Sequence, residues 1–322
     1  MDLSKFNKCI LFLFILVLNI PMSAYEERYA EKDGLKIYYR DYGPLNAEPI
    51  LLVQGLGGQL TFWPNNLIEF LIENNFRPIV YDNRDIGLST KFTGRPNFIT
   101  DYFKYFFRLP IESEYVIDDM ASDGVLVLDS LGIDSAHLLG MSMGGMIAQI
   151  IASNHPERIK SFTLIASTAA TPSPLNGPTR EVRKLIMDRT LTKNATYEER
   201  YKRSIKLISL IGMEGYEYDT PEFKEFSISN MKRSNDDTGF SRQLLAILAS
   251  KNRFDKIKSI NTPTLIIHGK EDPLLKVKNA YKMNELIPNS ELLIIDNMRH
   301  MIEPPILKQF ENKLINHLQN NS

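Results

Sequence analysis

Four stretches of the chain are apolar without alternating with polar residues. A strand that is buried on both faces has this composition, because helices pack against both sides of its sheet. The four stretches are residues 50–53, 78–81, 136–139 and 162–165, and the strand pattern returns at residues 264–267 and 291–295. The first four stretches predict the central strands of a parallel sheet.

Segments with apolar residues three or four positions apart separate these strands. In residues 117–131 and 146–151 the apolar side chains repeat on one helical face, and the pair His155-Pro156 ends the second segment. Residues 277–287 and 306–318 are also helical in pattern. The alternation of strand and helix predicts an α/β fold built on a mostly parallel, doubly wound sheet.

The N-terminal part of the fold has a different pattern. Residues 29–31 and 35–40 are short β-prone segments, and the dipeptide Asp33-Gly34 joins them. This dipeptide supplies the positive φ angles of a tight hairpin turn. We therefore expect the sheet to begin with two antiparallel strands.

The alternation of strand and helix stops at about residues 168–263. A Pro-rich segment at residues 171–174 is followed by helical segments rich in Lys, Glu and Arg, at residues 181–189, 197–211, 223–232 and 241–249. Because strands and helices alternate again after this region, it predicts a helical cap inserted into one domain. That domain is expected to span residues 25–322.

The first two dozen residues have the layout of a secretory signal. Lys5 and Lys8 precede an apolar run at residues 9–20, and Pro-Met-Ser-Ala follows at residues 21–24. We expect residues 1–24 to be a signal peptide cleaved after Ala24, and the protein to be exported to a periplasm or the medium. The run is too short to span a bilayer as a helix. Met22 is bulkier than the residue usual at that place, so contact with a membrane through an uncleaved anchor is the alternative.

Composition and charge exclude several classes of partner. Lys plus Arg (38) and Asp plus Glu (39) almost cancel, so no field of either sign favours nucleic acid, and a small, uncharged substrate fits better. The single cysteine, Cys9, lies in the predicted signal, and the five histidines show no metal-binding spacing. The sequence therefore predicts neither a metal nor another cofactor. The oligomeric state stays open.

Residues 140–144 read Gly-Met-Ser-Met-Gly and match the pattern G-x-S-x-G. They lie between a predicted strand, 136–139, and a predicted helix, 143–154, which is the strand-turn-helix context of a nucleophile elbow. The glycines allow the strand and the helix to approach closely, and the serine is held in a strained, exposed conformation. The motif predicts Ser142 as a nucleophile.

A serine nucleophile needs a base and an acid, which follow it in this fold in the order Asp or Glu, then His. Asp272 comes just after the strand 264–267, and His300 lies in the loop after the strand 291–295. The carboxyl ends of parallel strands meet at one edge of the sheet, where Ser142 also lies. His300 is the predicted base and Asp272 the acid that orients it. Glu271 is the neighbouring alternative, and the spacing of the motif favours Asp272. The remaining histidines have ordinary structural places: His137, His155, His268 and His317.

An oxyanion hole needs two backbone N–H groups, one after the nucleophile and one in a loop after an early strand. Met143 follows Ser142, and a glycine-rich loop at residues 54–58 follows the strand 50–53. We expect the N–H groups of Met143 and Leu56 to be the donors. The alternative for the loop is a plain flexible turn.

Three stretches, residues 81–90, 137–149 and 264–273, resemble the α/β-hydrolase fold carboxylesterases, especially the aclacinomycin methylesterase group. The resemblance covers nearly all of residues 29–318 and is weakest in the cap. It implies an α/β-hydrolase fold and ester hydrolysis. Gln54 stands where the family often has His, and Arg299 where a glycine commonly precedes the catalytic histidine. The charged turn at residues 83–85 is interpreted as structural.

A serine at the elbow argues against relatives that need an aspartate nucleophile, so acyl transfer to water remains. Ester hydrolysis is the expected reaction, and hydrolysis of carbon–carbon bonds, lactones or amides uses the same residues. A non-catalytic receptor that binds a small molecule under the cap is the alternative from another class. We expect the cap to set specificity, whereas the aromatic stretch at residues 98–107 is interpreted as packing more than pocket.

Overall fold

The structure is a computed structural model that describes residues 25–172, 177–188, 194–234 and 238–322. The predicted signal peptide, residues 1–24, lies outside the described residues. So do residues 173–174 of the Pro-rich segment and residue 189 at the end of a predicted helix. Within the described residues, the longest apolar helices fall short of what crossing a membrane requires.

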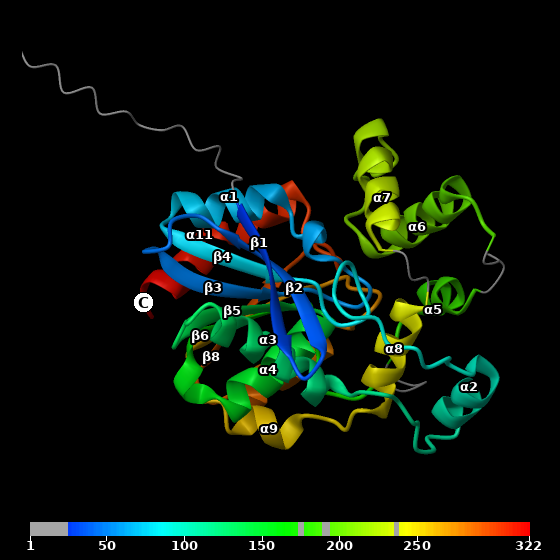
Figure 1. Cartoon of the computed structure of the whole chain (residues 1–322), viewed down its shortest axis with the longest axis horizontal. Coiled ribbons are helices and arrows are strands. Elements are labelled where there is room, and N and C mark those ends of the chain that lie inside the picture. The colour runs from blue at the N-terminus through cyan, green and yellow to red at the C-terminus, as the bar shows by residue number, and fades with distance from the viewer. Residues whose placement is uncertain (1–24, 173–176, 189–193, 235–237) are drawn as a thin grey trace, which may run out of the picture.

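One eight-stranded sheet forms the centre of the fold (Figure 1), with the strand order β1-β2-β4-β3-β5-β6-β7-β8. β2 pairs antiparallel with β1 and β4, and the pairs from β4 to β8 are parallel. The strands are β1 (Tyr25–Lys32), β2 (Leu35–Tyr42), β3 (Glu48–Val53), β4 (Phe76–Tyr81), β5 (Ala136–Met141), β6 (Ile159–Ile165), β7 (Thr264–Gly269) and β8 (Ser290–Ile295). The predicted mostly parallel sheet is confirmed.

The predicted buried strands are buried as their composition requires. β4, β5 and β7 are buried at every position. In β3, Leu51 and Val53 belong to one hydrophobic cluster, and Ile50 and Leu52 belong to a second cluster on the other side of the sheet. Each central strand therefore contributes side chains to two cores.

The N-terminal hairpin also agrees with its prediction. β1 and β2 pair antiparallel, with Lys32 opposite Leu35 at the turn. Asp33 (φ 49°) and Gly34 (φ 83°) both have the positive φ that a two-residue turn demands. β1 begins at Tyr25, four residues before the predicted segment, because Tyr25 pairs with Tyr42 at the far end of the hairpin.

Helices cover both faces of the sheet (Figure 1). One core lies between the sheet and α3 (Ile117–Ser130), α4 (Met143–Asn154), α9 (Phe254–Lys258) and α10 (Lys278–Leu286). The other lies under α1 (Asn65–Glu73) and α11 (Pro304–Gln319). Two short 3-10 helices, η1 (Leu60–Phe62) and η2 (Pro156–Arg158), join these elements. This arrangement on both faces is the doubly wound one.

Four helices between β6 and β7 stand beyond one end of the sheet (Figure 1), and we call them the cap helices. They are α5 (Arg180–Met187), α6 (Tyr197–Ile211), α7 (Pro221–Arg233) and α8 (Gly239–Ala249). Each corresponds to a predicted helix. A further helix, α2 (Phe98–Phe106), precedes α3 in the chain and lies on the same side as α8. α9 was not predicted, because five residues are too few to show a helical period.

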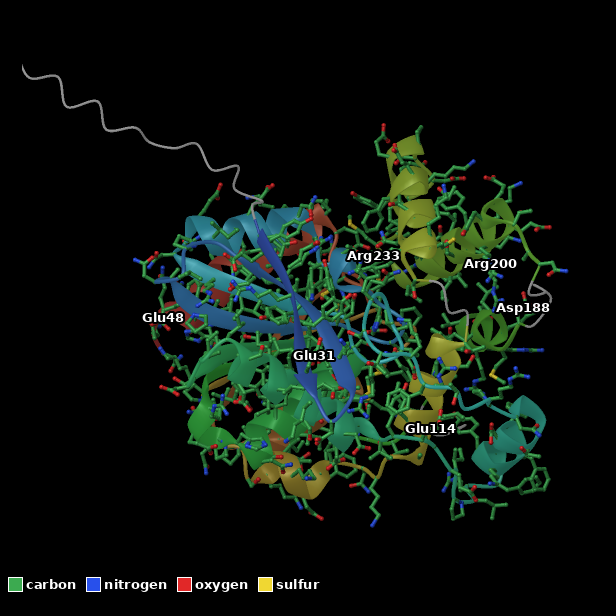
Figure 2. The ribbon with its side chains drawn as sticks, in the orientation of Figure 1. Glu31, Glu48, Glu114, Asp188, Arg200 and Arg233 are labelled. Carbon is green, nitrogen blue, oxygen red and sulfur yellow. The ribbon has the colours of Figure 1, made fainter. Side chains whose placement is uncertain are left out.

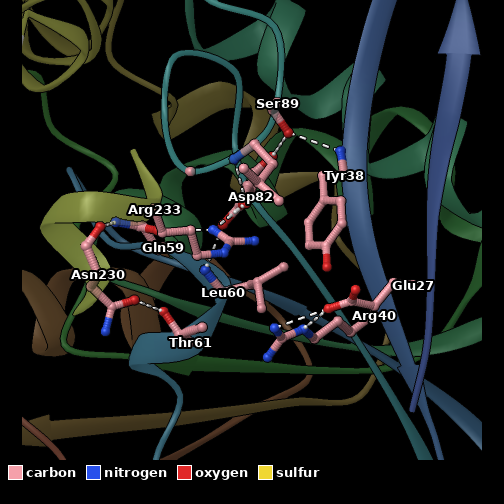
Figure 3. Close-up of polar contacts among 12 residues, drawn as sticks. Glu27, Tyr38, Arg40, Gln59, Leu60, Thr61, Asp82, Ser89, Asn230 and Arg233 are labelled. Carbon is pink, nitrogen blue, oxygen red and sulfur yellow. Dashed lines mark hydrogen bonds and ion pairs between the residues drawn. The ribbon is translucent and has the colours of Figure 1, made fainter. Parts of the chain in front are cut away.

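Buried ion pairs fix two cap helices to the sheet. Arg233, at the end of α7, lies 2.7 Å from Asp82 Oδ2, and Arg242 of α8 lies 2.8 Å from Asp85 Oδ1. Figure 2 places Arg233 at the base of α7, and Figure 3 shows its guanidinium between Asp82 and Gln59. Asp82 also accepts the N–H of Leu60 at 2.8 Å. The aspartates of the turn after β4 therefore hold the cap in place.

The structural interpretation of the turn at residues 83–85 is confirmed. Asn83 donates to the carbonyl oxygen of Gln54 at 2.9 Å, and Arg84 forms a bidentate ion pair with Asp123 at 2.6 and 2.7 Å. Asp85 accepts the hydroxyl of Tyr115 as well as Arg242. All of these groups are buried. The turn therefore contacts the loop after β3, helix α3 and the cap, and connects these three elements.

Candidate active site

Ser142 lies in a sharp turn between β5 and α4. Its backbone has φ 55° and ψ −120°, a strained conformation for a residue with a side chain. The glycines around it leave no room for side chains: a Cβ on Gly140 would lie 2.5 Å from the carbonyl oxygen of Gly144, and one on Gly144 would lie 1.9 Å from that of Val53. The Ser142 N–H donates to Ile165 in the neighbouring strand at 3.0 Å. These contacts fix the turn that the sequence motif predicted.

The structure brings together the three side chains that sequence analysis selected. His300 Nε2 lies 3.0 Å from Ser142 Oγ, and His300 Nδ1 lies 2.7 Å from Asp272 Oδ2. Asp272 follows β7 and His300 follows β8, so all three come from carboxyl ends of neighbouring strands. Glu271, the neighbouring alternative, is exposed. The geometry therefore favours Asp272 over Glu271 as the partner of His300.

Asp272 is held as a carboxylate. Burial alone would raise its pKa, but the charge and hydrogen bond of His300, and the N–H of Leu275, lower the pKa below its ordinary value. Its second oxygen, Oδ1, accepts the N–H groups of Leu274 and Leu275, both at 2.8 Å. One oxygen is thus fixed by the backbone, and the other faces His300 Nδ1. This arrangement orients the imidazole with Nε2 toward Ser142.

His268 is a neighbour of this site that sequence analysis treated as an ordinary strand residue. Its Nε2 lies 2.6 Å from the carbonyl oxygen of Leu275 and 3.5 Å from Asp272 Oδ2. Burial lowers the pKa of His268, so the ring is neutral and Nε2 carries the proton that it donates to Leu275.

The loop after β3 lies directly against the nucleophile, since a Cβ on Gly55 would be 3.1 Å from Ser142 Cβ. Three of its N–H groups have acceptors: Gly55 donates to Gln54 Oε1 at 2.8 Å, Gly57 to Gln243 Oε1 at 2.9 Å, and Gly58 to the carbonyl oxygen of Gly55 at 3.1 Å. No such acceptor is found for the N–H of Leu56 within the described part of the chain. The side chain of Gln54 therefore accepts the Gly55 N–H and not that of Leu56.

A cap residue that sequence analysis did not select holds this loop. Gln243 of α8 is fully buried and bridges two parts of the sheet domain. Its Oε1 accepts the N–H of Gly57, and its Nε2 donates to the carbonyl oxygen of Arg84 at 2.8 Å. Phe240, one turn earlier on α8, fills the space beside Gly57. Nothing local in the sequence of α8 indicates these contacts, because Gly57 and Gln243 are 186 residues apart.

A largely apolar cavity of about 150 Å³ opens at Ser142. Its floor is formed by residues that flank the nucleophile and the loop after β3, namely Leu56, Ser142, Met143 and Met146. The predicted apolar stripe of α8 lines one wall: Leu244, Leu245, Ile247 and Leu248. The cap helices therefore supply part of the apolar surface that a substrate would meet.

The aromatic helix α2 also lines this cavity, which corrects the interpretation of residues 98–107 as packing. Tyr102 and Tyr105 belong to the cavity wall. Phe103, Phe106 and Phe107 are not part of this wall, and they are about half exposed and contact one another. Which aromatic residues of α2 line the cavity depends on how the helix is placed, which the aromatic composition alone does not reveal.

The loop that carries His300 is attached to the end of α6 and to the segment that follows it. The His300 N–H donates to the carbonyl oxygen of Ile211 at 2.7 Å. Glu303, which is buried, accepts the N–H of Met213 at 2.8 Å and the hydroxyl of Tyr218. The position of His300 is therefore fixed in part by the cap.

The other histidines have structural contacts. His137 Nδ1 lies 2.7 Å from Ser161 Oγ, and His317 Nε2 lies 3.2 Å from the carbonyl oxygen of Phe162, both at the amino-terminal side of the sheet. His155 is at the end of α4. Among the residues that the structure describes, no three His, Cys, Asp or Glu side chains are grouped as a metal ion would need.

Comparison with known proteins identifies the family. Residues 48–302 match the family described as alpha/beta hydrolase fold. A rhodomycin D methylesterase from Streptomyces sp. (strain C5) is 26% identical over 293 residues, which cover 85% of this chain and 92% of the relative. A 2-hydroxymuconate semialdehyde hydrolase from Pseudomonas sp. (strain CF600) is 25% identical over 267 residues, or 78% of this chain and 80% of the relative.

A solved structure agrees with this assignment. The enol-lactonase from Burkholderia xenovorans LB400 has a TM-score of 0.69 and 22% identity, with 91% of this chain and 100% of that chain covered. This likeness shows the fold. The sequence resemblance to the aclacinomycin methylesterase group agrees with the methylesterase relatives. The sheet, the turn at Ser142 and the family match lead to one conclusion: the chain belongs to the α/β-hydrolase fold family.

Proposed function

We propose that the protein is a serine hydrolase that cleaves a small, largely apolar carboxylic ester through an acyl-enzyme intermediate. One observation carries the proposal: Asp272, His300 and Ser142 form a continuous chain of contacts of 2.7 and 3.0 Å that ends at an apolar cavity. A buried carboxylate, an oriented imidazole and a serine hydroxyl in this order are the parts that nucleophilic acyl transfer requires.

The first half of the reaction forms the acyl-enzyme. His300 Nε2 takes the proton of Ser142 Oγ as Oγ bonds to the ester carbonyl carbon, and Asp272 stabilises the imidazolium through Nδ1. The carbonyl oxygen becomes an oxyanion, and the N–H groups of Leu56 and Met143 are the proposed donors that stabilise it. The carbon–oxygen bond then breaks, and Nε2 gives its proton to the leaving alkoxide. An alcohol departs, and the acyl group remains on Ser142.

The second half repeats these steps with water. His300 takes a proton from a water molecule whose oxygen attacks the acyl carbonyl carbon, and the same two N–H groups stabilise the new oxyanion. The bond to Ser142 Oγ breaks, and Oγ recovers a proton from Nε2. The carboxylic acid leaves, and the site returns to its starting state.

The relatives support an ester as substrate and name the competing reactions. The methylesterases are named for ester cleavage. The 2-hydroxymuconate semialdehyde hydrolase and the enol-lactonase are named for other hydrolytic substrates. Because the proposed steps need only a carbonyl carbon and a leaving group, hydrolysis of lactones, amides or carbon–carbon bonds is an outcome that the substrate test must include.

The proposal is tested with a fluorophosphonate probe and a panel of acyl esters, lactones, amides and diketones. We expect stoichiometric labelling of Ser142, and loss of labelling together with a fall in kcat of about 10⁴-fold or more in Ser142→Ala. Ser153→Ala, on the same helix but bonded only locally, should label and turn over like the wild type. If no member of the panel is hydrolysed by the wild type, or if Ser142→Ala keeps its activity, a non-catalytic receptor or another mechanism takes the place of this proposal.

A further inference from the structure

One wall of the cavity at Ser142 differs from the rest, because it carries a carboxylate. Asp101 of α2 lines the cavity together with Tyr102 and Tyr105. Asp101 and Tyr105 are four residues apart, and side chains with this spacing lie on the same face of a helix. α2 therefore turns a polar face toward the cavity.

One oxygen of the Asp101 carboxylate, Oδ2, has no hydrogen-bond partner among the described residues. This oxygen is buried. A buried polar atom without a partner costs free energy that is comparable to a lost hydrogen bond, and such atoms are rare in folded proteins. The rest of the wall is largely apolar, with leucines of α8 and with Ile186 and Met187 of α5.

We propose that Asp101 is a specificity-determining residue that accepts a hydrogen bond from a donor group on the substrate. This inference rests on the proposed ester hydrolysis and narrows it to a class: apolar esters that carry a hydroxyl or ammonium group away from the scissile bond. The donor would supply the partner that Oδ2 lacks, and the apolar body would contact the stripe of α8. Arg183, the other charged residue of the wall, already donates to the carbonyl oxygen of Pro178 at 3.0 Å.

Asp101 also has a structural role to be separated from this one. It lies in the first turn of α2, where a carboxylate favours the helix dipole. If that were its whole role, replacing Asp101 would change the hydrolysis of every ester by the same factor. A role in recognition changes only the ratio between esters with and without the donor. The ratio of kcat/KM values is therefore the informative measurement.

The experiment compares pairs of esters that differ by one terminal group, a methyl group against a hydroxyl or an ammonium group, on either side of the ester bond and at several chain lengths. We expect the wild type to prefer the donor-bearing ester of at least one pair by about 10-fold or more in kcat/KM. Asp101→Leu should abolish this preference and keep the hydrolysis of methyl-terminated esters. Asp101→Asn retains an acceptor oxygen but no charge, so it should keep part of a hydroxyl preference and lose an ammonium preference.

The matched control is Glu112→Gln, because the side chain of Glu112 is 96% exposed and is not part of this cavity wall. It should leave every ratio unchanged. The inference is overturned if the wild type hydrolyses methyl-terminated esters through Ser142 but shows no donor preference, or if Asp101→Leu keeps the preference. If the wild type hydrolyses no ester at all, the proposed function fails, and that result is distinct from a missing preference.

Discussion

Arg299 forms an ion pair with Glu214 at 2.8 Å, and this contact joins the residue before His300 to the segment after α6. The pair is largely open to solvent on the Glu214 side, where the side chain is 79% exposed. Exposed pairs contribute about 0–1 kcal/mol, so this one gives the loop little stability. The buried contacts of Glu303 and of the His300 N–H with the same segment are the ones that fix the loop.

The first prediction separates these contacts. Glu303→Ala leaves the Met213 N–H and the Tyr218 hydroxyl without their acceptor, so it should lower the free energy of unfolding by about 1–3 kcal/mol. We also expect kcat to fall about 10-fold with little change in KM, because His300 loses part of its support. Arg299→Gly should change kcat less than about 3-fold. Steady-state kinetics and urea unfolding of both variants measure these changes. An equal fall in kcat in Glu303→Ala and Arg299→Gly would contradict the prediction.

The second prediction concerns Gln243, which holds the loop that contains Leu56. Gln243→Leu removes the acceptor of the Gly57 N–H and the donor to Arg84 at nearly constant volume. We expect kcat to fall about 10-fold or more, since a misplaced oxyanion donor weakens transition-state stabilisation. Gln309→Leu, at an exposed position on α11, is the control and should behave as the wild type. Unchanged kcat in Gln243→Leu would show that α8 does not position this loop.

The third prediction compares ion pairs of different burial. Arg242→Met leaves the buried Asp85 without its charged partner, which should cost about 3 kcal/mol or more in the free energy of unfolding. The exposed pair between Arg28 and Glu26 provides the matched control, and Arg28→Met should cost less than about 1 kcal/mol. Denaturant unfolding of both variants measures the difference. Equal costs would show that the cap is not held by its buried pairs.

The fourth prediction is a pH dependence of stability that comes from His137. Burial lowers the pKa of His137 from 6.5 to about 4, so between these values the unfolded chain binds a proton that the native protein does not. Stability from this residue is therefore complete above about pH 6.5 and falls as the pH decreases toward about 4. The loss between pH 7 and pH 5 should be roughly 1–2 kcal/mol.

His137→Asn tests this dependence. The variant should lose less stability than the wild type between the two pH values, even if it is less stable at both, because the titrating group is gone. His137 lies at the amino-terminal side of β5, away from Ser142, so kcat should follow the fraction of folded protein. The same pH slope in both proteins would assign the dependence to other groups, among them His317, whose pKa is also lowered by burial.

The fifth prediction is that residues 1–24 direct export and are removed. The layout of Lys5 and Lys8 before an apolar run predicts a mature chain that begins at Tyr25, which is also the first residue of β1. N-terminal sequencing of the native protein and fractionation of the cells measure this. Recovery of a chain that begins at Met1 from a membrane fraction would indicate an uncleaved anchor, and the same chain in the cytosol would refute export.

The strands, the turn at Ser142 and the contacts of His300 could be predicted because the signals for them are local. The glycines around Ser142 are required by backbone approach within a few residues, and Asp272 and His300 each follow a strand whose composition is visible in the sequence. Parallel strands then bring these loops to one edge without any further information. Because the local sequence patterns and the topology of the sheet agree here, one sequence is enough to predict the strands and the meeting of these three side chains.

The contacts between cap and sheet could not be predicted in this way. Gln243 meets Gly57 and Arg233 meets Asp82 only because α7 and α8 fold back over the sheet, and the helical period says nothing of where a helix docks. The same limit applies to α2. Its aromatic residues predict an apolar surface, but which of them line the cavity depends on how the helix is placed in three dimensions.

The bridge formed by Gln243 has a consequence for how this enzyme could diversify. Insertions on a shared scaffold are commonly regarded as exchangeable modules that alter selectivity and leave the reaction chemistry untouched. Here a side chain of the insertion, Gln243, also holds the loop that carries one of the two proposed oxyanion donors. A transplanted insertion without an equivalent glutamine would bring new selectivity together with slower turnover. Selection on substrate range and selection on turnover rate therefore both act on α8. A substitution in α8 that alters the substrate range is constrained by its effect on the rate.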